Sequence, residues 1–126
     1  AWIEARAGLI LVCGPHGAGK STTIAALIDH LNATRRMHIV SLEAPIRVLH
    51  RHQRSVITQR ELGRHTASFA TAIRAALKQD ADVIAISELS ERETIINAID
   101  AAHQGALVIA EAHSPSPVSA IEGLLS

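Results

Sequence analysis

The pattern Gly14-Pro15-His16-Gly17-Ala18-Gly19-Lys20-Ser21 constrains the fold of this chain more than any other feature. It has the GxxxxGK[ST] spacing of a phosphate-binding loop, in which backbone N–H groups surround phosphate oxygens and glycines leave room for them. An apolar run from Leu9 to Cys13 precedes the loop, and Ser21 to Ala33 carries apolar residues at helical spacing. The residues therefore predict a buried strand, a phosphate-binding loop and a helix, in that order.

The residue types of this loop predict what it binds. Lys20 would reach the β- and γ-phosphates of a nucleoside triphosphate as a point charge, and the Ser21 hydroxyl would ligate Mg²⁺. The helix that begins there adds its positive dipole end. A Gly-rich turn that binds nothing is the alternative, but it does not explain the strand and the helix on either side. The predicted binding residues for ATP are Gly14, Pro15, His16, Gly17, Ala18, Gly19, Lys20, Ser21 and Thr22.

Strands and helices continue to alternate after the loop. The apolar patterns predict strands at His38 to Glu43, Asp82 to Ser87 and Ala106 to Ala112. Helices are predicted at Thr66 to Lys78 and Glu91 to Gln104, with the start of another at Val118 to Leu125. This alternation predicts an α/β fold with a mostly parallel sheet, helices on both faces and ligands at the carboxyl ends of the strands.

Two acids at strand ends are the candidate catalytic residues. Glu88 follows the apolar strand Val83 to Ser87, which is the form of a Walker B strand, and would hold Mg²⁺ or polarise the attacking water. Glu43 ends another predicted strand. We predict Glu88 and Glu43 as catalytic acids, and Ser21 and Glu88 as Mg²⁺ ligands. For each glutamate, the alternative is a solvated loop acid.

Two further residues lie near the predicted fourth strand. His113 follows it and could hydrogen-bond a γ-phosphate, although a lone histidine at a strand end is more often structural. Glu111 lies within the strand, and together with His113 it is insufficient to define a site. The histidines show no metal-ligand spacing supported by cysteine or acid pairs, so no zinc site is predicted.

Composition limits the other functions. At 126 residues with 48% apolar side chains, one domain over residues 1–126 is expected, and equal numbers of acidic and basic residues give no bulk attraction to nucleic acid or membrane. No apolar stretch approaches the roughly 20 residues that span a bilayer, and the single Cys13 is typical of a reducing compartment. A soluble, cytoplasmic chain without membrane insertion is therefore expected.

Charge is nevertheless uneven along the chain. Residues 35–64 hold seven arginines against two glutamates. The segment has no aromatic side chain on which a base could stack, so direct binding of nucleic acid is the least favoured interpretation. A solvated or subunit-facing surface is expected here.

Motifs along nearly the whole chain resemble those of the secretion ATPase superfamily. They are Gly8-Leu9-Ile10-Leu11-Val12 before the loop, Ser41-Leu42-Glu43, Gln59-Arg60-Glu61-Leu62-Gly63, Leu77-Lys78-Gln79-Asp80, Glu93-Thr94-Ile95 and His113-Ser114. The Gln-Arg-Glu segment most resembles the PilT-type ATPases that retract type IV pili. The resemblance implies a RecA-like ATPase core in which the fourth predicted strand lies between the first and the third.

The resemblance also implies an assembly and a cellular place. It implies a hexameric motor, either a homo-hexamer or a mixed hexamer with a paralogue, that acts on a pilus or secretion platform protein at the inner face of the inner membrane. Members of this superfamily carry a smaller domain before the core and further helices after it. Residues 1–126 are therefore expected to be a partial RecA-like domain.

The resemblance assigns roles residue by residue. Lys20 and Ser21 take the Walker A positions, while Glu43, Glu88 and His113 take the Asp box, Walker B and His box. The same boxes depart from the family's pattern at Ala44, Arg47, Ser90, Ala106 and Glu111. Lost cations and an added anion weaken stabilisation of the charge that develops in phosphoryl transfer. The expected function is therefore an ATP-hydrolysing pilus retraction motor. The alternative is a catalytically weakened nucleotide-binding subunit that assembles with an active paralogue.

Overall fold

The chain folds into one sheet with helices on both faces. The computed structural model describes residues 2–6, 8–14 and 19–112. Within these residues the strands are β1 (Trp2–Arg6), β2 (Leu9–Cys13), β3 (His38–Glu43), β4 (Val56–Glu61), β5 (Val83–Ile86) and β6 (Leu107–Ala112). The helices are α1 (Lys20–Thr34), α2 (Phe69–Lys78) and α3 (Arg92–His103).

The sheet has the strand order β1-β2-β6-β5-β3-β4. All neighbouring pairs are parallel except β1 and β2, which run antiparallel. The strand β6 lies between β2 and β5, as the family resemblance implied. The α/β class and the mostly parallel sheet are therefore confirmed, and the carboxyl ends of the five parallel strands meet at one edge.

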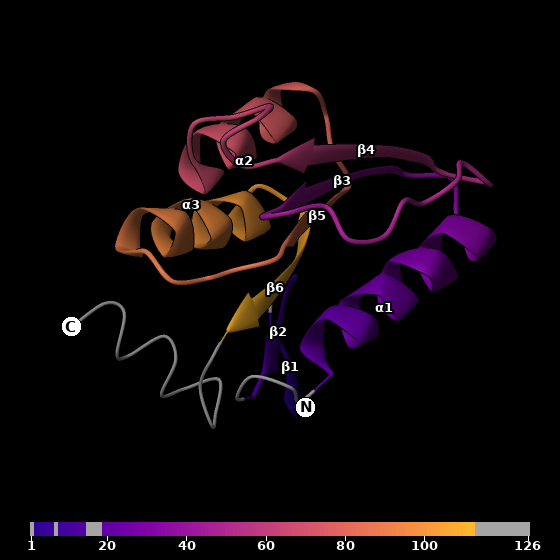
Figure 1. Cartoon of the computed structure of the whole chain (residues 1–126), viewed down its shortest axis with the longest axis horizontal. Helices are drawn as coiled ribbons and strands as arrows, with labels where there is room; N and C mark the ends of the chain where they lie inside the picture. Colours follow the sequence, from indigo (N-terminus) through magenta and orange to yellow (C-terminus); the bar gives the residue numbers. More distant parts are fainter. Residues whose placement is uncertain (1, 7, 15–18, 113–126) are drawn as a thin grey trace.

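The two faces of the sheet carry separate halves of the core. Figure 1 shows α1 on one side of the strands, with α2 and α3 together on the other. Side chains alternate accordingly along β5: Ile84 and Ile86 pack in the cluster that contains α2 and α3 residues, and Val83 and Ala85 pack in the α1 cluster. Because β5 is buried on both faces, its sequence is continuously apolar, as is typical of central parallel strands.

Two strands were missed in the sequence-based expectation. The edge strand β4 pairs with β3 over its whole length, although its second half reads Gln59-Arg60-Glu61. Its first three residues are β-branched, which favours a strand, but the surrounding charge hides this pattern. The strand β1 precedes the apolar strand of the predicted motif and also carries charged residues.

Helix α2 begins three residues later than predicted. Ser68 has extended backbone angles, and its side chain accepts a hydrogen bond from the Thr71 N–H at 3.1 Å. This contact satisfies one of the free amides of the first turn, so Ser68 is the N-cap and the helix starts at Phe69. Thr66, the predicted start, instead accepts a hydrogen bond at its carbonyl from the Gly63 N–H.

Some expectations fall on residues outside the described ones. These are the loop residues Pro15, His16, Gly17 and Ala18, the candidate phosphate contact His113, and the helix expected at 118–125. In the part of the chain that the structure describes, no helix has the length and apolar character needed to cross a bilayer.

Substitution of Ile84 tests the packing of the central strand. Ile84 is fully buried on β5, so Ile84→Ala should lower the free energy of unfolding by about 2–5 kcal/mol. Ile96 on α3 is 43% exposed, and Ile96→Ala is the matched control, with a loss of less than about 1 kcal/mol expected. Urea denaturation followed by circular dichroism measures both. Equal losses in the two variants would contradict the two-faced core.

Candidate functional site

The start of α1 is built to face an anion. Gly19 precedes the helix in a left-handed conformation, with φ +79°, which glycine adopts without strain. The first turn contains no acidic residue, so no side chain of that turn neutralises the positive end of the helix dipole. Lys20, the first helical residue, is 5% exposed, and its Nζ donates a hydrogen bond to the Gly14 carbonyl at 2.6 Å. The two described ends of the loop are thereby joined.

A cavity of about 460 Å³ opens beside this helix end. Its walls come from the first turns of α1, the carboxyl ends of β3, β5 and β6, and the loop that follows β3. Several residues predicted for the site line it: Gly19, Lys20, Ser21, Thr22, Glu43 and Glu88. Among the described residues, the structure therefore brings the last residues of the predicted Walker A loop and both predicted acids to one cavity at the carboxyl edge of the sheet.

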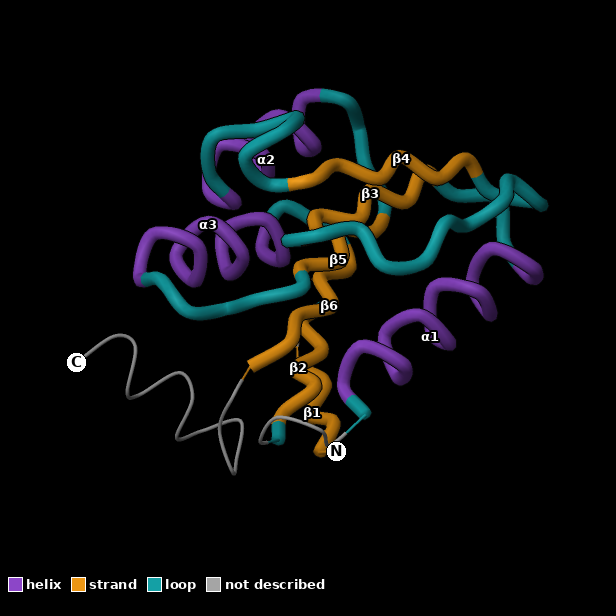
Figure 2. The backbone as a smooth tube through the Cα atoms, viewed as in Figure 1, coloured by secondary structure: helices purple, strands orange, loops and turns teal. Residues whose placement is uncertain are grey.

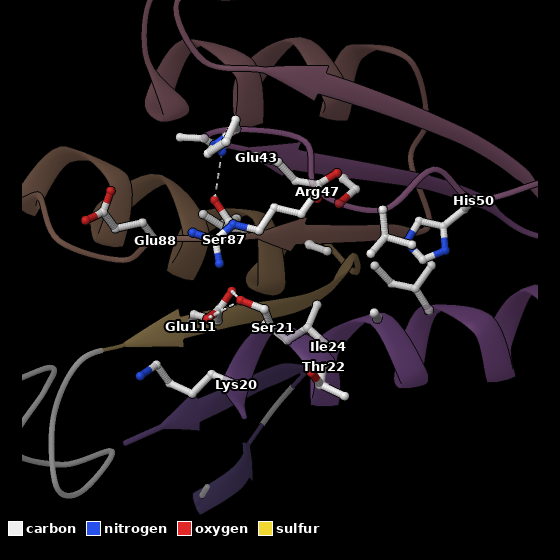
Figure 3. A pocket seen from close by; sticks show the side chains of 18 of the residues that line it. Lys20, Ser21, Thr22, Ile24, Glu43, Arg47, His50, Ser87, Glu88 and Glu111 are labelled. Atoms are coloured by element: carbon white, nitrogen blue, oxygen red, sulfur yellow. Dashed lines mark hydrogen bonds between the residues drawn. The ribbon is translucent and has the colours of Figure 1, made fainter. Parts of the chain in front are cut away.

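Glu111 also lines this cavity, although it was not among the predicted site residues. The residue lies on β6 and is only 6% exposed. Both of its carboxylate oxygens lie 3.3 Å from the Ser21 hydroxyl, which donates to them. Figure 3 shows the two side chains facing each other across the cavity floor. Glu111 therefore lines the candidate site together with Ser21, at the position where the family resemblance implied an added anion.

Burial sets the protonation behaviour of Glu111. Loss of hydration raises the pKa of its carboxyl group above the ordinary 4.5. The hydrogen bond from Ser21 and the charges of Lys20 and Arg47 lower that pKa, while the charge of Glu43 raises it, and burial is the largest of these effects. Arg47, which departs from the family's Asp box, therefore acts on the same carboxylate as the Walker A lysine.

Glu43 is held at the cavity wall by a neighbouring strand. Gln59 on β4 donates from its Nε2 to Glu43 Oε2 at 2.9 Å and to the Val48 carbonyl at 2.7 Å. Gln59 Oε1 in turn accepts from the His50 N–H at 3.0 Å. The strand that the sequence did not predict thus fixes both a candidate catalytic acid and the loop that follows β3.

The side chain of Glu88 points in a different direction from that of Glu111. It lines the cavity at the end of β5, but Figure 3 shows its side chain pointing away from Ser21 and Glu111. The strand end itself is fixed, since the Ala44 N–H donates to Ser87 Oγ at 3.1 Å and the Leu89 N–H donates to the Glu111 carbonyl at 2.8 Å. The structure thus places Ser21 with Glu111 rather than with Glu88, the other predicted Mg²⁺ ligand.

The Arg/His-rich segment forms one wall of the cavity. Figure 2 shows the loop after β3 running back along α1 before β4 begins. Asn32 near the end of α1 fixes this loop: its Nδ2 donates to the Arg51 carbonyl at 2.6 Å, and its Oδ1 accepts from the Gln53 and Ser55 amides at 3.1 and 3.3 Å. The segment was expected to be a solvated or subunit-facing surface, and part of it instead encloses the cavity.

The oxygen atoms around the cavity suit a small divalent cation. Hydroxyl and carboxylate oxygens are the protein ligands that Mg²⁺ prefers, and Ser21, Glu43, Glu88 and Glu111 supply them. Among the described residues, no group of three or more His, Cys, Asp or Glu side chains could hold a metal ion. These residues fit Mg²⁺ bound in part by the phosphates of a nucleotide, and they do not form an all-protein metal cage.

The raised pKa of Glu111 makes a pH-dependent prediction. As pH rises from the ordinary 4.5 through the raised pKa, the unfolded chain loses its proton first, so this residue's contribution to stability falls. Glu111→Gln removes that loss. Without nucleotide or metal, the melting temperature of the variant should equal that of the parent near pH 4 and exceed it increasingly toward pH 7. A variant that is less stable at pH 7 would contradict this, and Glu93→Gln on the exposed start of α3 is the control.

Comparison with known proteins supports the resemblance. The family model described as type II/IV secretion system protein matches residues 1–126. A twitching motility protein of Neisseria gonorrhoeae is 43% identical over 122 residues, which are 97% of this chain and 33% of that protein. The type IV pilus retraction ATPase PilT of Pseudomonas aeruginosa is 44% identical over 115 residues, which are 91% of this chain and 33% of that protein.

A solved structure also resembles this chain. The crystal structure of the pilus retraction motor PilT with bound ADP superimposes with a TM-score of 0.88 at 46% identity, over 93% of this chain and 34% of that one. The chain thus spans about a third of the length of the relatives it matches. Since the family model matches every residue, the chain belongs to the type II/IV secretion system protein family.

Proposed function

We propose that this chain is the nucleotide-binding region of an ATPase that drives pilus retraction. The observation that carries the proposal is the cavity at the start of α1, where Lys20 and Ser21 meet acids from three strand ends. The relatives named above support the reaction and the process, since one is a pilus retraction ATPase and another a twitching motility protein.

The side chains would divide the chemistry among them. Lys20 contributes a positive charge to the β- and γ-phosphates of ATP, and the amides at the start of α1 bind phosphate oxygens. Ser21 and Glu88 hold Mg²⁺, which supplies charge neutralisation at the phosphates. Glu88 and Glu43 orient the attacking water, while His113, outside the described residues, contacts the γ-phosphate.

The proposal extends to assembly and location. We infer a hexamer, formed by identical subunits or shared with a paralogue, that acts on the platform protein of a pilus or secretion system. The complex works in the cytoplasm at the inner face of the inner membrane. Residues 1–126 make up part of one RecA-like domain, and direct binding of nucleic acid plays no part in this function.

Binding and hydrolysis of ATP test the proposal in sequence. The protein at its natural full length should bind ATP in calorimetry with Mg²⁺ present and should release phosphate faster than its Lys20→Ala variant. Absence of ATP binding would overturn the nucleotide site. Binding with equal phosphate release in both proteins would overturn the enzyme activity alone.

A weakened subunit is the second candidate, and two observations favour it. Glu88 points away from Ser21, and Arg47 and Glu111 place a cation and an anion where the family pattern has other residues. This candidate binds ATP without turnover and regulates or transmits force within a mixed ring. Phosphate release that appears only after an active paralogue is added would support it, whereas clear hydrolysis by the protein alone would exclude it.

A further inference from the structure

The position of Glu111 raises a question that the proposed function leaves open. A carboxylate on a central strand, 6% exposed, loses most of its hydration and needs compensating partners. Within the part of the chain that the structure describes, the side chain's hydrogen-bond partner is the Ser21 hydroxyl. The charges of Lys20 and Arg47 also act on this carboxyl group, but its printed hydrogen bonds come from one neutral hydroxyl, so a cation bound directly to the carboxylate would compensate its burial better.

The distances between the two side chains agree with such a partner. A hydrogen bond from a hydroxyl to a carboxylate is normally about 2.5–2.7 Å long. Here both oxygens of Glu111 lie 3.3 Å from Ser21 Oγ. Adjacent ligands of an octahedral ion with bonds of about 2.0–2.1 Å lie about 2.8–3.0 Å apart. The observed spacing is longer than both values, so Ser21 holds the carboxylate weakly, and a cation shared by the two side chains would bring them a few tenths of an ångström closer.

We propose that Glu111 and Ser21 are the protein ligands of the divalent cation that enters this cavity with the nucleotide. The inference rests on the proposed function and changes one part of it, since it places Glu111 in the role expected of Glu88. Ser21 is exposed at the cavity, so an ion can reach its hydroxyl while the carboxylate lies buried behind it. Figure 3 shows the Glu88 carboxylate apart from this pair and turned away from it.

Because Glu111 and Ser21 supply only part of an octahedral shell, we expect the cation to bind together with the nucleotide. Within the described residues there is no cluster of three or more metal-binding side chains, and one carboxylate with one hydroxyl leaves most of an octahedron to other oxygens. Mg²⁺ commonly completes its shell with substrate phosphates and water. The nearby charges of Lys20 and Arg47 disfavour a cation at this point until phosphates offset them.

Metal affinity measured separately from activity tests the inference. The full-length protein is titrated with Mn²⁺ in the presence and absence of ADP, and free Mn²⁺ is followed by electron paramagnetic resonance. Glu111→Gln keeps the size of the side chain and an acceptor for Ser21 but removes the charge. We expect it to weaken ADP-dependent Mn²⁺ binding roughly 10- to 100-fold. Glu93→Gln, on an exposed first turn of α3, should leave Mn²⁺ binding unchanged.

Calorimetry with ADP in EDTA separates this inference from the proposed function. When no metal is present, Glu111→Gln should bind ADP at least as tightly as the parent, because the substitution removes a negative charge near the phosphates, and this binding also shows that the variant is folded. Mn²⁺ binding in Glu111→Gln that is as tight as in the parent, or tighter, would overturn the role of Glu111 while leaving the nucleotide site intact. Failure of the parent to bind ADP with or without metal would overturn both.

Discussion

Replacing Lys20 by alanine will weaken ATP binding roughly 10- to 100-fold. This range follows from losing one charge-assisted hydrogen bond to phosphate, which contributes about 1.5–3 kcal/mol. Phosphate release should fall further, by about 10²- to 10³-fold, because negative charge that develops during transfer loses a positioned cation. Lys20 is buried at the base of the cavity, so water replaces its ammonium group poorly. Calorimetry and a phosphate-release assay measure the two effects.

The chain offers a matched control for this substitution. Lys78 is the only other lysine of the sequence, and it lies exposed at the end of α2, on the opposite face of the sheet from α1. Lys78→Ala removes the same side chain and should change neither ATP affinity nor phosphate release. Parallel losses in the two lysine variants would show that net charge, rather than the position of Lys20, controls binding.

The central strands of the sheet were predictable because their side chains are almost all apolar. The strands β2, β5 and β6 are buried on both faces, so their apolar runs stand out from the helices that separate them. The edge strand β4 was not predictable in the same way. Only one of its six residues is buried, so Gln59 and Arg60 are tolerated, and its pairing with β3 depends on backbone hydrogen bonds that no side-chain pattern reports.

The site shows a similar division. The Walker A residues could be predicted because a phosphate-binding loop requires glycines, a lysine and a hydroxyl at fixed spacing. The contact of Glu111 with Ser21 was not predicted because it follows from strand order: β6 lies beside β2, which brings the last residues of β6 next to the start of α1. In the sequence, Glu111 is a single acid within the apolar residues of β6. Its contact with Ser21 becomes visible only in the folded structure.

The role of Glu88 can be separated from that of its neighbours by a single neutral substitution. If Glu88 orients the attacking water, Glu88→Gln should lower phosphate release by about 10²- to 10⁴-fold, the usual contribution of a positioned general base. ATP affinity should change little, because the side chain points away from the Walker A residues, as Figure 3 shows. Glu93→Gln, which neutralises an exposed acid five residues later, is the control and should retain full activity.

The outcome shows whether Glu88 is the catalytic acid. A large loss of phosphate release in Glu88→Gln requires that the Glu88 side chain turns toward the nucleotide during turnover, since it points away from Ser21 and Glu111 in the present arrangement. The hydrogen bonds at Ser87 and Leu89 hold the strand end on both sides, so this movement is a change of side-chain rotamer rather than of backbone. If the parent hydrolyses ATP and Glu88→Gln does so equally fast, Glu88 is not the catalytic acid, and Glu43, held by Gln59 at the same cavity, becomes the residue to replace next.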